Sequence, residues 1–420
     1  MTERLLQYIW QFQYFNTNNL QTKQLQDLQI IFPGNSNPNQ GPDFLNGKIK
    51  IDNTTWAGSI ELHINSGDWK LHNHSNDKNY NNVILHVVWK DDVDLQLPFP
   101  TLELHNKVSK ILLKKYEELV HSQYFIPCEN HLQEINELVL AKWKESLLVQ
   151  RLQQKAVYIE SLLKKNNQHW EECFWWMLAR NLGTKINSDA FEKMAQSISL
   201  KILGKHKNQL IQLEALLLGQ AGLLTENFDE DYPIMLKKEF RFLQNKYKLK
   251  EAYYPLYFLR MRPANFPTIR LAQLAMLIHE SSNLFDTIRE IQNCTDAENL
   301  FKVTANDYWH YHYIFDETSA FKRKSIGKEM IRNILINTVI PMLYAYGYFN
   351  NKESFKTKAL NWMEQLSPEK NNITKGFETL NIKNKSAFDS QALIHLKHEY
   401  CDHKRCLECA IGNNILKIVK

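Results

Sequence analysis

The segment Gly41-Pro42-Asp43-Phe44 is followed by a second segment, Gly58-Ser59-Ile60-Glu61-Leu62-His63-Ile64. The second segment alternates like a β-strand, so Glu61 and His63 should project from one face while Leu62 points into the core. If residues 41–51 form the neighbouring strand, Asp43 can reach the same point. Two carboxylates and the backbone carbonyl of Leu62 would offer the oxygen ligands that Mg²⁺ or Mn²⁺ prefers. The two segments therefore predict a sheet with a metal site held by Asp43 and Glu61.

Histidines are concentrated around these acidic residues, because seven of the fifteen lie between His63 and His131. Clustered imidazoles beside carboxylates are candidates for metal ligands or acid–base groups. The alternative is turn chemistry at Asp43 and a strand with one polar face at Glu61 and His63. The predicted catalytic residues are Asp43, Glu61, His63, His72, His74 and Asp77.

Pro42-Asp43 followed by Glu61-Leu62-His63 resembles the PD-(D/E)xK pattern of metal-dependent nucleases, with His63 where that superfamily usually has Lys. The likeness covers about residues 1–110. It implies a restriction-endonuclease-like domain that hydrolyses nucleic acid with Mg²⁺ or Mn²⁺. The missing Lys normally steadies the attacking water and the developing charge, and Lys48 or Lys50 on the preceding strand is the candidate replacement.

Nearly the whole chain also resembles a bacterial family of unknown function, domain of unknown function 2851. The resemblance rests on the GPDF and IELHI segments, on Asp68-Trp69 with His72 and His74, and on the C-terminal cysteines. This family likeness implies no particular activity.

Hydrophobic periodicity predicts an α+β protein. We expect an amphipathic helix over residues 3–15, a strand at Leu28–Phe32, and strands near 44–52, 55–65, 82–89 and 99–104. Helical patterns dominate from about residue 135, at 138–163, 170–182, 189–203, 210–218, 232–247, 267–282 and 328–346. The predicted domains are a nuclease-like α/β domain (1–130), an all-helical domain (135–390) and a Cys-containing segment (391–420) packed on the helical domain.

Three arginines gather near a Pro-rich turn in the helical part. Guanidinium groups suit phosphate geometry, so Arg260, Arg262 and Arg270 are candidate nucleic-acid contacts. Alternatively, Arg262 and Arg270 cap helix ends or pair with acids, and Pro267 begins a helix.

The C-terminal part contains a cysteine motif, Cys401-x₄-Cys406-x₂-Cys409. Such spacing is typical of a Zn²⁺ site or an iron–sulfur cluster. The fourth ligand could be Cys128, His403 or His398. Some nucleases of the PD-(D/E)xK superfamily hold a cluster with cysteines far apart in sequence, and this resemblance implies Cys128. The alternative is a set of reduced cytosolic thiols, because a disulfide is rare in the cytoplasm.

Composition narrows the function classes without selecting one. The chain has 420 residues, 44% of them hydrophobic, and a net charge of +5, which is compatible with a polyanionic partner. No apolar run approaches the ~20 residues that span a bilayer, so we expect a cytoplasmic protein. Signatures of nucleotide-dependent motors, dinucleotide enzymes, zincins and α/β-hydrolases are absent.

Two functions from different classes follow from the sequence. The first is a metal-dependent nuclease or phosphodiesterase, a hydrolase. The alternative is a non-catalytic nucleic-acid-binding or scaffold protein with a decayed nuclease-like domain. Hydrolysis of a small phosphorylated substrate is also compatible with the same chemistry.

Overall fold

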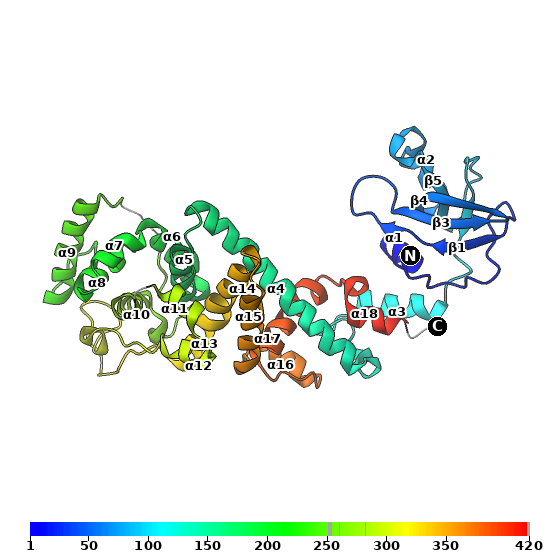
Figure 1. The fold of residues 1–420 in the computed structure, drawn as a ribbon. Coiled ribbons are helices and arrows are strands. Elements are labelled where there is room, and N and C mark those ends of the chain that lie inside the picture. The colour runs from blue at the N-terminus through cyan, green and yellow to red at the C-terminus, as the bar shows by residue number, and fades with distance from the viewer. Residues whose placement is uncertain (251–253, 260, 282, 418–420) are drawn as a thin grey trace. The chain divides into compact units, whose positions relative to one another are not determined.

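The computed structural model describes residues 1–250, 254–259, 261–281 and 283–417 (Figure 1). The chain forms two compact units. The first unit contains Met1–Lys144 and the segment from His395 onward, and the helical unit is Glu145–Ile394. The sequence placed residues 391–420 on the helical domain, whereas most of this segment, with all three C-terminal cysteines, belongs to the first unit.

The first unit is built around one mixed sheet, which has the order β1-β3-β4-β5-β6, with β2 paired to β3. The pairs β1/β3 and β3/β4 are antiparallel, and β4/β5 and β5/β6 are parallel. The strands are β1 (Leu28–Phe32), β2 (Asn35–Ser36), β3 (Phe44–Ile51), β4 (Thr54–Asn65), β5 (Val83–Lys90) and β6 (Thr101–Glu103). The α+β class and the main strand positions therefore agree with the sequence prediction.

Helix α1 (Glu3–Gln11) packs against β4 with its apolar face (Figure 1). Leu6 and Ile9 are fully buried, as the helical spacing of apolar residues in this segment predicts. The Thr2 hydroxyl accepts a hydrogen bond from the Leu5 amide at 3.3 Å and caps the helix. The helix ends earlier than predicted, at Gln11.

Gly58 allows β5 to approach β4 closely. A Cβ at this position would lie 2.5 Å from the Asn82 carbonyl oxygen, and the neighbouring Ser59 amide donates to that same oxygen at 2.8 Å. This contact fixes the start of the parallel β4/β5 ladder, in which Glu61 lies opposite His86. The glycine thus sets the register on which the histidine cluster depends.

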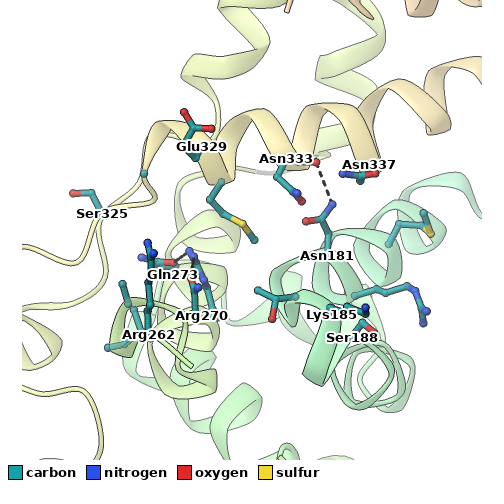
Figure 2. A pocket seen from close by; sticks show the side chains of 18 of the residues that line it. Asn181, Lys185, Ser188, Arg262, Arg270, Gln273, Ser325, Glu329, Asn333 and Asn337 are labelled. Atoms are coloured by element: carbon teal, nitrogen blue, oxygen red, sulfur yellow. Dashed lines mark hydrogen bonds between the residues drawn. The ribbon is translucent and has the colours of Figure 1, made fainter. Parts of the chain in front are cut away.

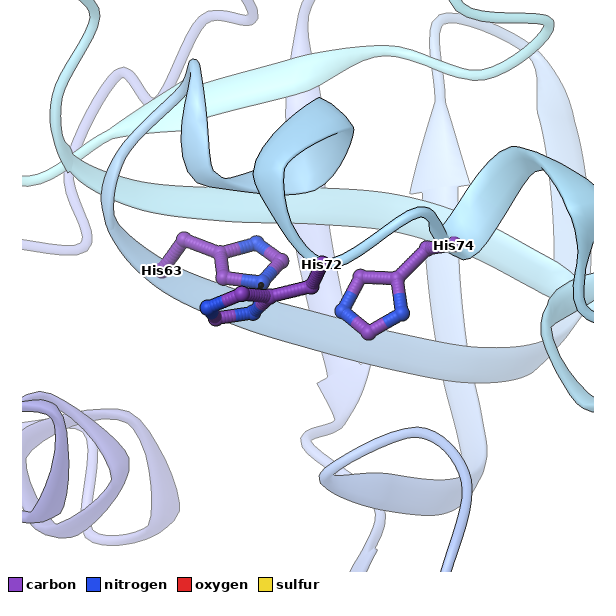
Figure 3. Close-up of side chains that lie close together, drawn as sticks. All are labelled: His63, His72 and His74. Atoms are coloured by element: carbon purple, nitrogen blue, oxygen red, sulfur yellow. Dashed lines mark hydrogen bonds between the residues drawn. The ribbon is translucent and has the colours of Figure 1, made fainter.

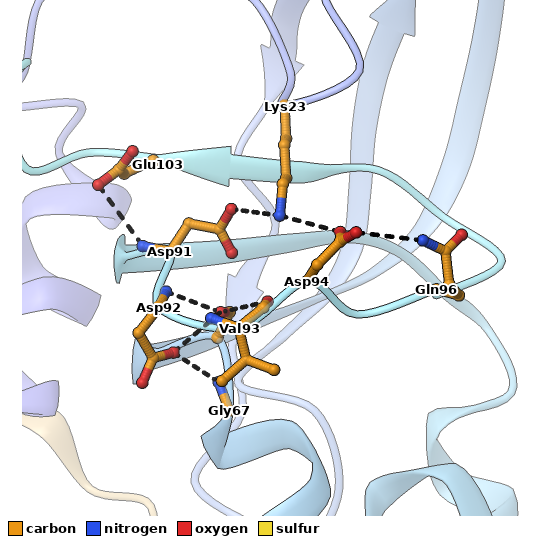
Figure 4. Close-up of polar contacts among 9 residues, drawn as sticks. Lys23, Gly67, Asp91, Asp92, Val93, Asp94, Gln96 and Glu103 are labelled. Atoms are coloured by element: carbon orange, nitrogen blue, oxygen red, sulfur yellow. Dashed lines mark hydrogen bonds and ion pairs between the residues drawn. The ribbon is translucent and has the colours of Figure 1, made fainter.

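The turn after β4 is held by a hydrogen-bond network with the segment after β5 (Figure 4). The Ser66 hydroxyl donates to Asp92 at 3.0 Å, and the same carboxylate oxygen accepts from the Gly67 amide at 3.0 Å. Lys23 pairs with Asp91 at 2.6 Å and with Asp94 at 3.1 Å. The network fixes the start of helix α2 (Asp68–Leu71) and the two short 3₁₀ turns His74–Asn76 and Lys78–Tyr80 that follow it.

The remaining helices of the first unit are α3 (Lys110–His121) and α18 (Ala410–Lys417), with 3₁₀ turns at Glu129–Glu134 and Cys406–Glu408. The π-helical turn Leu396–Cys401 leads into the cysteine segment. Helix α3 and helix α18 contact each other.

The helical unit confirms most predicted helices, with two differences. The helix predicted over 189–203 is interrupted, because α6 ends at Ser197 and α7 begins at Leu200. The pattern over 328–346 contains a π-helical turn, Leu335–Val339, between α13 and α14. The α-helices are α4 (Glu137–Lys165, which begins in the first unit), α5 (Trp170–Leu182), α6 (Thr184–Ser197), α7 (Leu200–Lys205), α8 (Leu210–Gln220), α9 (Asp231–Tyr247), α10 (Pro267–Glu280), α11 (Leu284–Glu290), α12 (Cys294–Asn299), α13 (Lys328–Ile334), α14 (Ile340–Phe349), α15 (Glu353–Gln365), α16 (Asn372–Thr379) and α17 (Ala387–His395).

Within the part of the chain that the structure describes, no helix combines the length and apolar character needed to cross a bilayer.

Candidate metal centre

Asp43 and Glu61 are held together by reciprocal contacts across the β3/β4 hairpin. The Asp43 amide donates to Glu61 Oε2 at 3.0 Å, and the Leu62 amide donates to Asp43 Oδ2 at 3.1 Å. From α1, the Gln7 side chain donates to Asp43 Oδ1 at 2.8 Å. Both Asp43 oxygens and Glu61 Oε2 therefore accept hydrogen bonds from the protein. Glu61 Oε1 accepts none of these bonds and faces the histidines.

The imidazoles of His63 and His74 lie next to that oxygen, and His72 lies beside His63 (Figure 3). One ring nitrogen of each lies within 4.8 Å of the others. Figure 3 shows His63 on β4, while His72 and His74 come from the α2 turn that crosses above it. The hydrogen bonds of Ser66 and Gly67 with Asp92 hold the turn that precedes α2. This turn therefore brings the three rings together.

Three distances among these side chains are close to those of a tetrahedral metal site. His63 Nε2 lies 3.2 Å from His72 Nδ1, and Glu61 Oε1 lies 3.6 Å from His63 Nε2 and 3.5 Å from His74 Nε2. Ligand atoms at ~2.1 Å from a tetrahedral ion are separated by about 3.4 Å. The three imidazoles are therefore candidate ligands of one divalent ion, and Glu61 is the carboxylate beside two of them.

A further histidine orients His63. His63 Nδ1 lies 2.9 Å from His86 Nε2, and a bond donated by Nδ1 leaves Nε2 free to bind a metal. Tyr80 stacks on the His74 ring with centroids 3.9 Å apart. His74 Nε2 is buried and has no hydrogen-bond partner among the described residues. A buried ring nitrogen without a partner, facing a carboxylate oxygen, is what an unfilled ligand position would show.

The pKa shifts support the same assignment. Burial, followed by the charge of Asp43, raises the pKa of Glu61 to about 9, and burial raises that of Asp43 to about 7. Burial, with the neighbouring imidazoles, lowers the pKa of His63 to about 2, and burial lowers that of His74. The His63 and His74 imidazoles are therefore in the neutral form that binds metals, and a divalent cation would relieve the cost of ionising the carboxylates.

The structure adds nitrogen donors to the predicted oxygen donors. The sequence predicted an oxygen-rich site made by Asp43 and Glu61, which stays a prediction, and the structure places His63 and His74 beside Glu61. Asp77 lies near His74 and acts on its pKa, yet its Oδ1 caps the next turn by accepting from the Asn79 amide at 2.9 Å.

Neither predicted lysine replaces the missing Lys. Lys48 pairs with Ala57 and Lys50 with Thr55 in the β3/β4 ladder. These partners are four and six residues from Glu61, which is about 13 and about 20 Å along a strand. The sequence interpretation also missed His86 and Gln7. His86 could have been found from its position in the neighbouring parallel strand, where it lies opposite Glu61. That requires knowledge of the register between the two strands.

The predicted arginines belong to the helical unit and not to this centre. Arg262 is exposed and Arg270 is buried, and both line a cavity described below. Arg260 lies outside the described residues. The Arg270 guanidinium donates to the side chains of Gln273 and Asn265, so these partners are amides and not the acids that the alternative interpretation expected.

The four cysteines predicted to form one centre are neighbours in the first unit, and all are free thiols. Burial, followed by the charges of Cys409 and Cys406, raises the pKa of Cys128. Burial and the charge of Cys128 raise that of Cys401. His398 instead pairs with Asp402 at 3.2 Å.

These sulfurs lie farther from one another than the sulfurs of a formed zinc site do. Among the described residues, three ligand atoms converge within 4.8 Å only at the histidine cluster, whereas zinc-bound sulfurs lie about 3.8 Å apart. A cofactor at these thiols stays a prediction.

Comparison with known proteins gives one match. Neither the curated proteins nor the solved structures contain a match. Residues 3–372 match the model of a family described as "Protein of unknown function (DUF2851)", and the chain therefore belongs to this family.

Proposed function

We propose that the first unit is a metal-dependent hydrolase of phosphodiester bonds in nucleic acid. The observation that carries the proposal is the cluster of His63, His72 and His74, whose ring nitrogens lie within 4.8 Å of one another, with Glu61 Oε1 at 3.6 Å from His63 and 3.5 Å from His74. Such a set requires precise placement of two segments, and the chain supplies it through the β4/β5 register and the fixed α2 turn.

The order of elements supports nucleic acid as the substrate. An N-terminal helix, an antiparallel hairpin bearing Asp43 and Glu61, a helical turn and a parallel strand follow one another. PD-(D/E)xK nucleases place their acidic residues on such a hairpin, which is the resemblance noted from the sequence.

The residues of the centre have distinct roles in this proposal. A bound divalent ion supplies Lewis acidity and a water of lowered pKa. Glu61 and the three imidazoles hold it, while His86 orients His63 and Asp43 orients Glu61. His72 is the exposed member of the cluster, so substrate would approach from its side.

The test is cleavage of end-labelled single- and double-stranded DNA and RNA with Mg²⁺, Mn²⁺ or Zn²⁺. Wild type should cleave at least one substrate, and His74→Ala and Glu61→Gln should reduce the rate by at least tenfold. Glu103→Gln is the matched control, because Glu103 is an exposed glutamate at the end of β6 in the same sheet. Equal background for wild type and Glu61→Gln would refute the catalytic role.

The alternative function is nucleic-acid binding without cleavage, which His63 in the usual Lys position favours. It predicts salt-dependent binding with no metal-dependent product. Binding of this kind, together with wild-type inactivity on all four substrates, would establish the alternative.

A further inference from the structure

The helical unit contains a large cavity whose lining is strongly basic (Figure 2). Its volume is about 1470 Å³, and it is lined by residues of α4, α5, α6, α10 and α13 and of the segments before α10 and α13. The basic lining residues are Arg151, Lys155, Arg180, Lys185, Arg262, Arg270, Lys322, Arg323 and Lys324.

The two acidic residues in the lining offset only a small part of this charge. Asp189 pairs with Arg180 at 2.6 Å, and Glu329 pairs with Arg332, which lies outside the lining, at 3.1 Å. The cavity is therefore a region of positive potential within a unit of low-dielectric helices.

Arg270 is buried in the wall of this cavity, with 6% of its surface exposed. Its two terminal nitrogens donate to Gln273 at 2.8 Å and to Asn265 at 2.6 Å, and its Nε is buried without a partner. The Gln273 amide is itself fixed, because it donates to the Lys324 carbonyl at 3.1 Å. Figure 2 shows Arg262 beside Arg270 and Gln273 on this wall. The guanidinium is thus held in place by neutral groups, which leave its charge uncompensated.

Lys324 is a second buried cation in the same wall, with 4% of its surface exposed. Its Nζ has no hydrogen-bond partner among the described residues and lies 3.6 Å from the centroid of the Tyr313 ring. A lysine ammonium has three donors, and burial of a charge without an acceptor is costly. Contact with one aromatic face offsets only part of that cost.

Two buried cations with unpaired donors in one cavity form a site suited to an anion. We propose that this cavity binds the phosphate groups of a nucleotide, either free or within a nucleic-acid strand, with Arg270 and Lys324 as the contacting residues. Guanidinium and ammonium groups both suit phosphate oxygens. Amide side chains of Asn181, Asn333 and Asn337 on the opposite wall (Figure 2) offer hydrogen bonds to a base or sugar.

The size of the cavity favours a ligand larger than one inorganic anion. Sites for drug-sized ligands occupy about 300–1,000 Å³, and this cavity is larger. The proposal is independent of the metal centre, because every residue in it belongs to the helical unit.

The test is equilibrium binding to the full chain in EDTA at 50 mM NaCl, so that metal-dependent cleavage cannot interfere. The three probes are pyrophosphate, ATP and a fluorescein-labelled ten-nucleotide oligo(dT). Tighter binding of ATP than of oligo(dT) assigns a free nucleotide, and the reverse order assigns a strand. Pyrophosphate should compete with whichever binds. Failure of all three probes to bind at 1 mM overturns the proposal, whatever the first unit does.

Two variants locate the site. Lys324→Met keeps the length of the side chain and should weaken binding at least tenfold, and Arg270→Gln should do the same. Lys201→Met, at an exposed lysine on α7, should bind as wild type does. Because Lys324 Nζ has no hydrogen bond to lose among the described residues, Lys324→Met should also melt at a higher temperature than wild type without ligand. Unchanged affinity in Lys324→Met refutes the assignment. If a variant fails to fold, the melting temperature of wild type tests the proposal. Saturating pyrophosphate must raise that temperature, and an unchanged melting temperature refutes binding.

Discussion

Replacing Glu61 with Gln should change the pH dependence of stability in the metal-free protein. Glu61 is 4% exposed, and its pKa is raised from its ordinary 4.5 to about 9. Between pH 5 and pH 7 the folded state keeps this proton while the unfolded chain releases it. The contribution of Glu61 to stability therefore falls as pH rises, by about 1.36 kcal/mol per pH unit, which is about 2.7 kcal/mol over the two units.

Glutamine cannot ionise, so Glu61→Gln should lack this loss. The free energy of unfolding of wild type relative to Glu61→Gln should fall by about 2.7 kcal/mol from pH 5 to pH 7, whereas Glu103→Gln should run parallel to wild type. Carboxylates other than Asp43, which interacts with Glu61, are common to the proteins and cancel in the difference. Saturating Mn²⁺ should abolish the Glu61-dependent loss in wild type, because the metal binds the ionised carboxylate.

Hydrogen–deuterium exchange of peptides covering β3 and β4 measures this difference in the free energy of unfolding within the first unit. Protection of these amides reports local and global opening. Wild type and Glu61→Gln are compared at the same pH, so the intrinsic exchange rate cancels. Parallel protection of the two proteins from pH 5 to pH 7 would show that Glu61 is not held protonated in the metal-free state.

Three further predictions concern the support of the centre, the sheet and the cysteines. His86→Ala should weaken metal binding by about 10–100-fold, because it removes the group that orients His63, and unchanged affinity in a chelator competition would contradict that role. Gly58→Val should destabilise the first unit by about 1–3 kcal/mol, since the new side chain meets the Asn82 carbonyl and Ile84 at 2.5 Å; Gly204→Ala, whose Cβ meets nothing within 4 Å, is the control and should melt no lower than wild type. If Cys128 and the three C-terminal cysteines hold an iron–sulfur cluster, anaerobically purified protein should absorb visible light, and Cys128→Ser and Cys406→Ser should lose the band equally; colourless protein without bound iron would leave them as thiols.

The strands and most helices could be predicted from the sequence because their residues alternate or repeat locally. The pairing of Asp43 with Glu61 was also accessible, since a turn and a strand of period two place both at one end of a hairpin. The role of His86 was not accessible, because it depends on the β4/β5 register that Gly58 sets. The membership of the C-terminal segment in the first unit depends on long-range packing, which a local pattern cannot report.

The residues of the candidate site could be proposed from the sequence, but their contacts could not. The hydrogen bonds that Asp43 accepts from Gln7 and Leu62 are tertiary, so a local sequence pattern does not report them. The convergence of His72 and His74 on His63 depends on the turn fixed by Ser66 and Asp92, which sequence spacing alone does not specify.

The central claim is that three imidazoles and Glu61 bind one divalent ion. Pulsed electron paramagnetic resonance of the full chain with one equivalent of Mn²⁺ tests it directly, because Mn²⁺ avoids thiolates and the method detects bound imidazole nitrogen. Wild type should show couplings to imidazole nitrogens, and His74→Ala should lose one nitrogen or the ion itself. Manganese with oxygen ligands alone, or no bound manganese, would contradict the account.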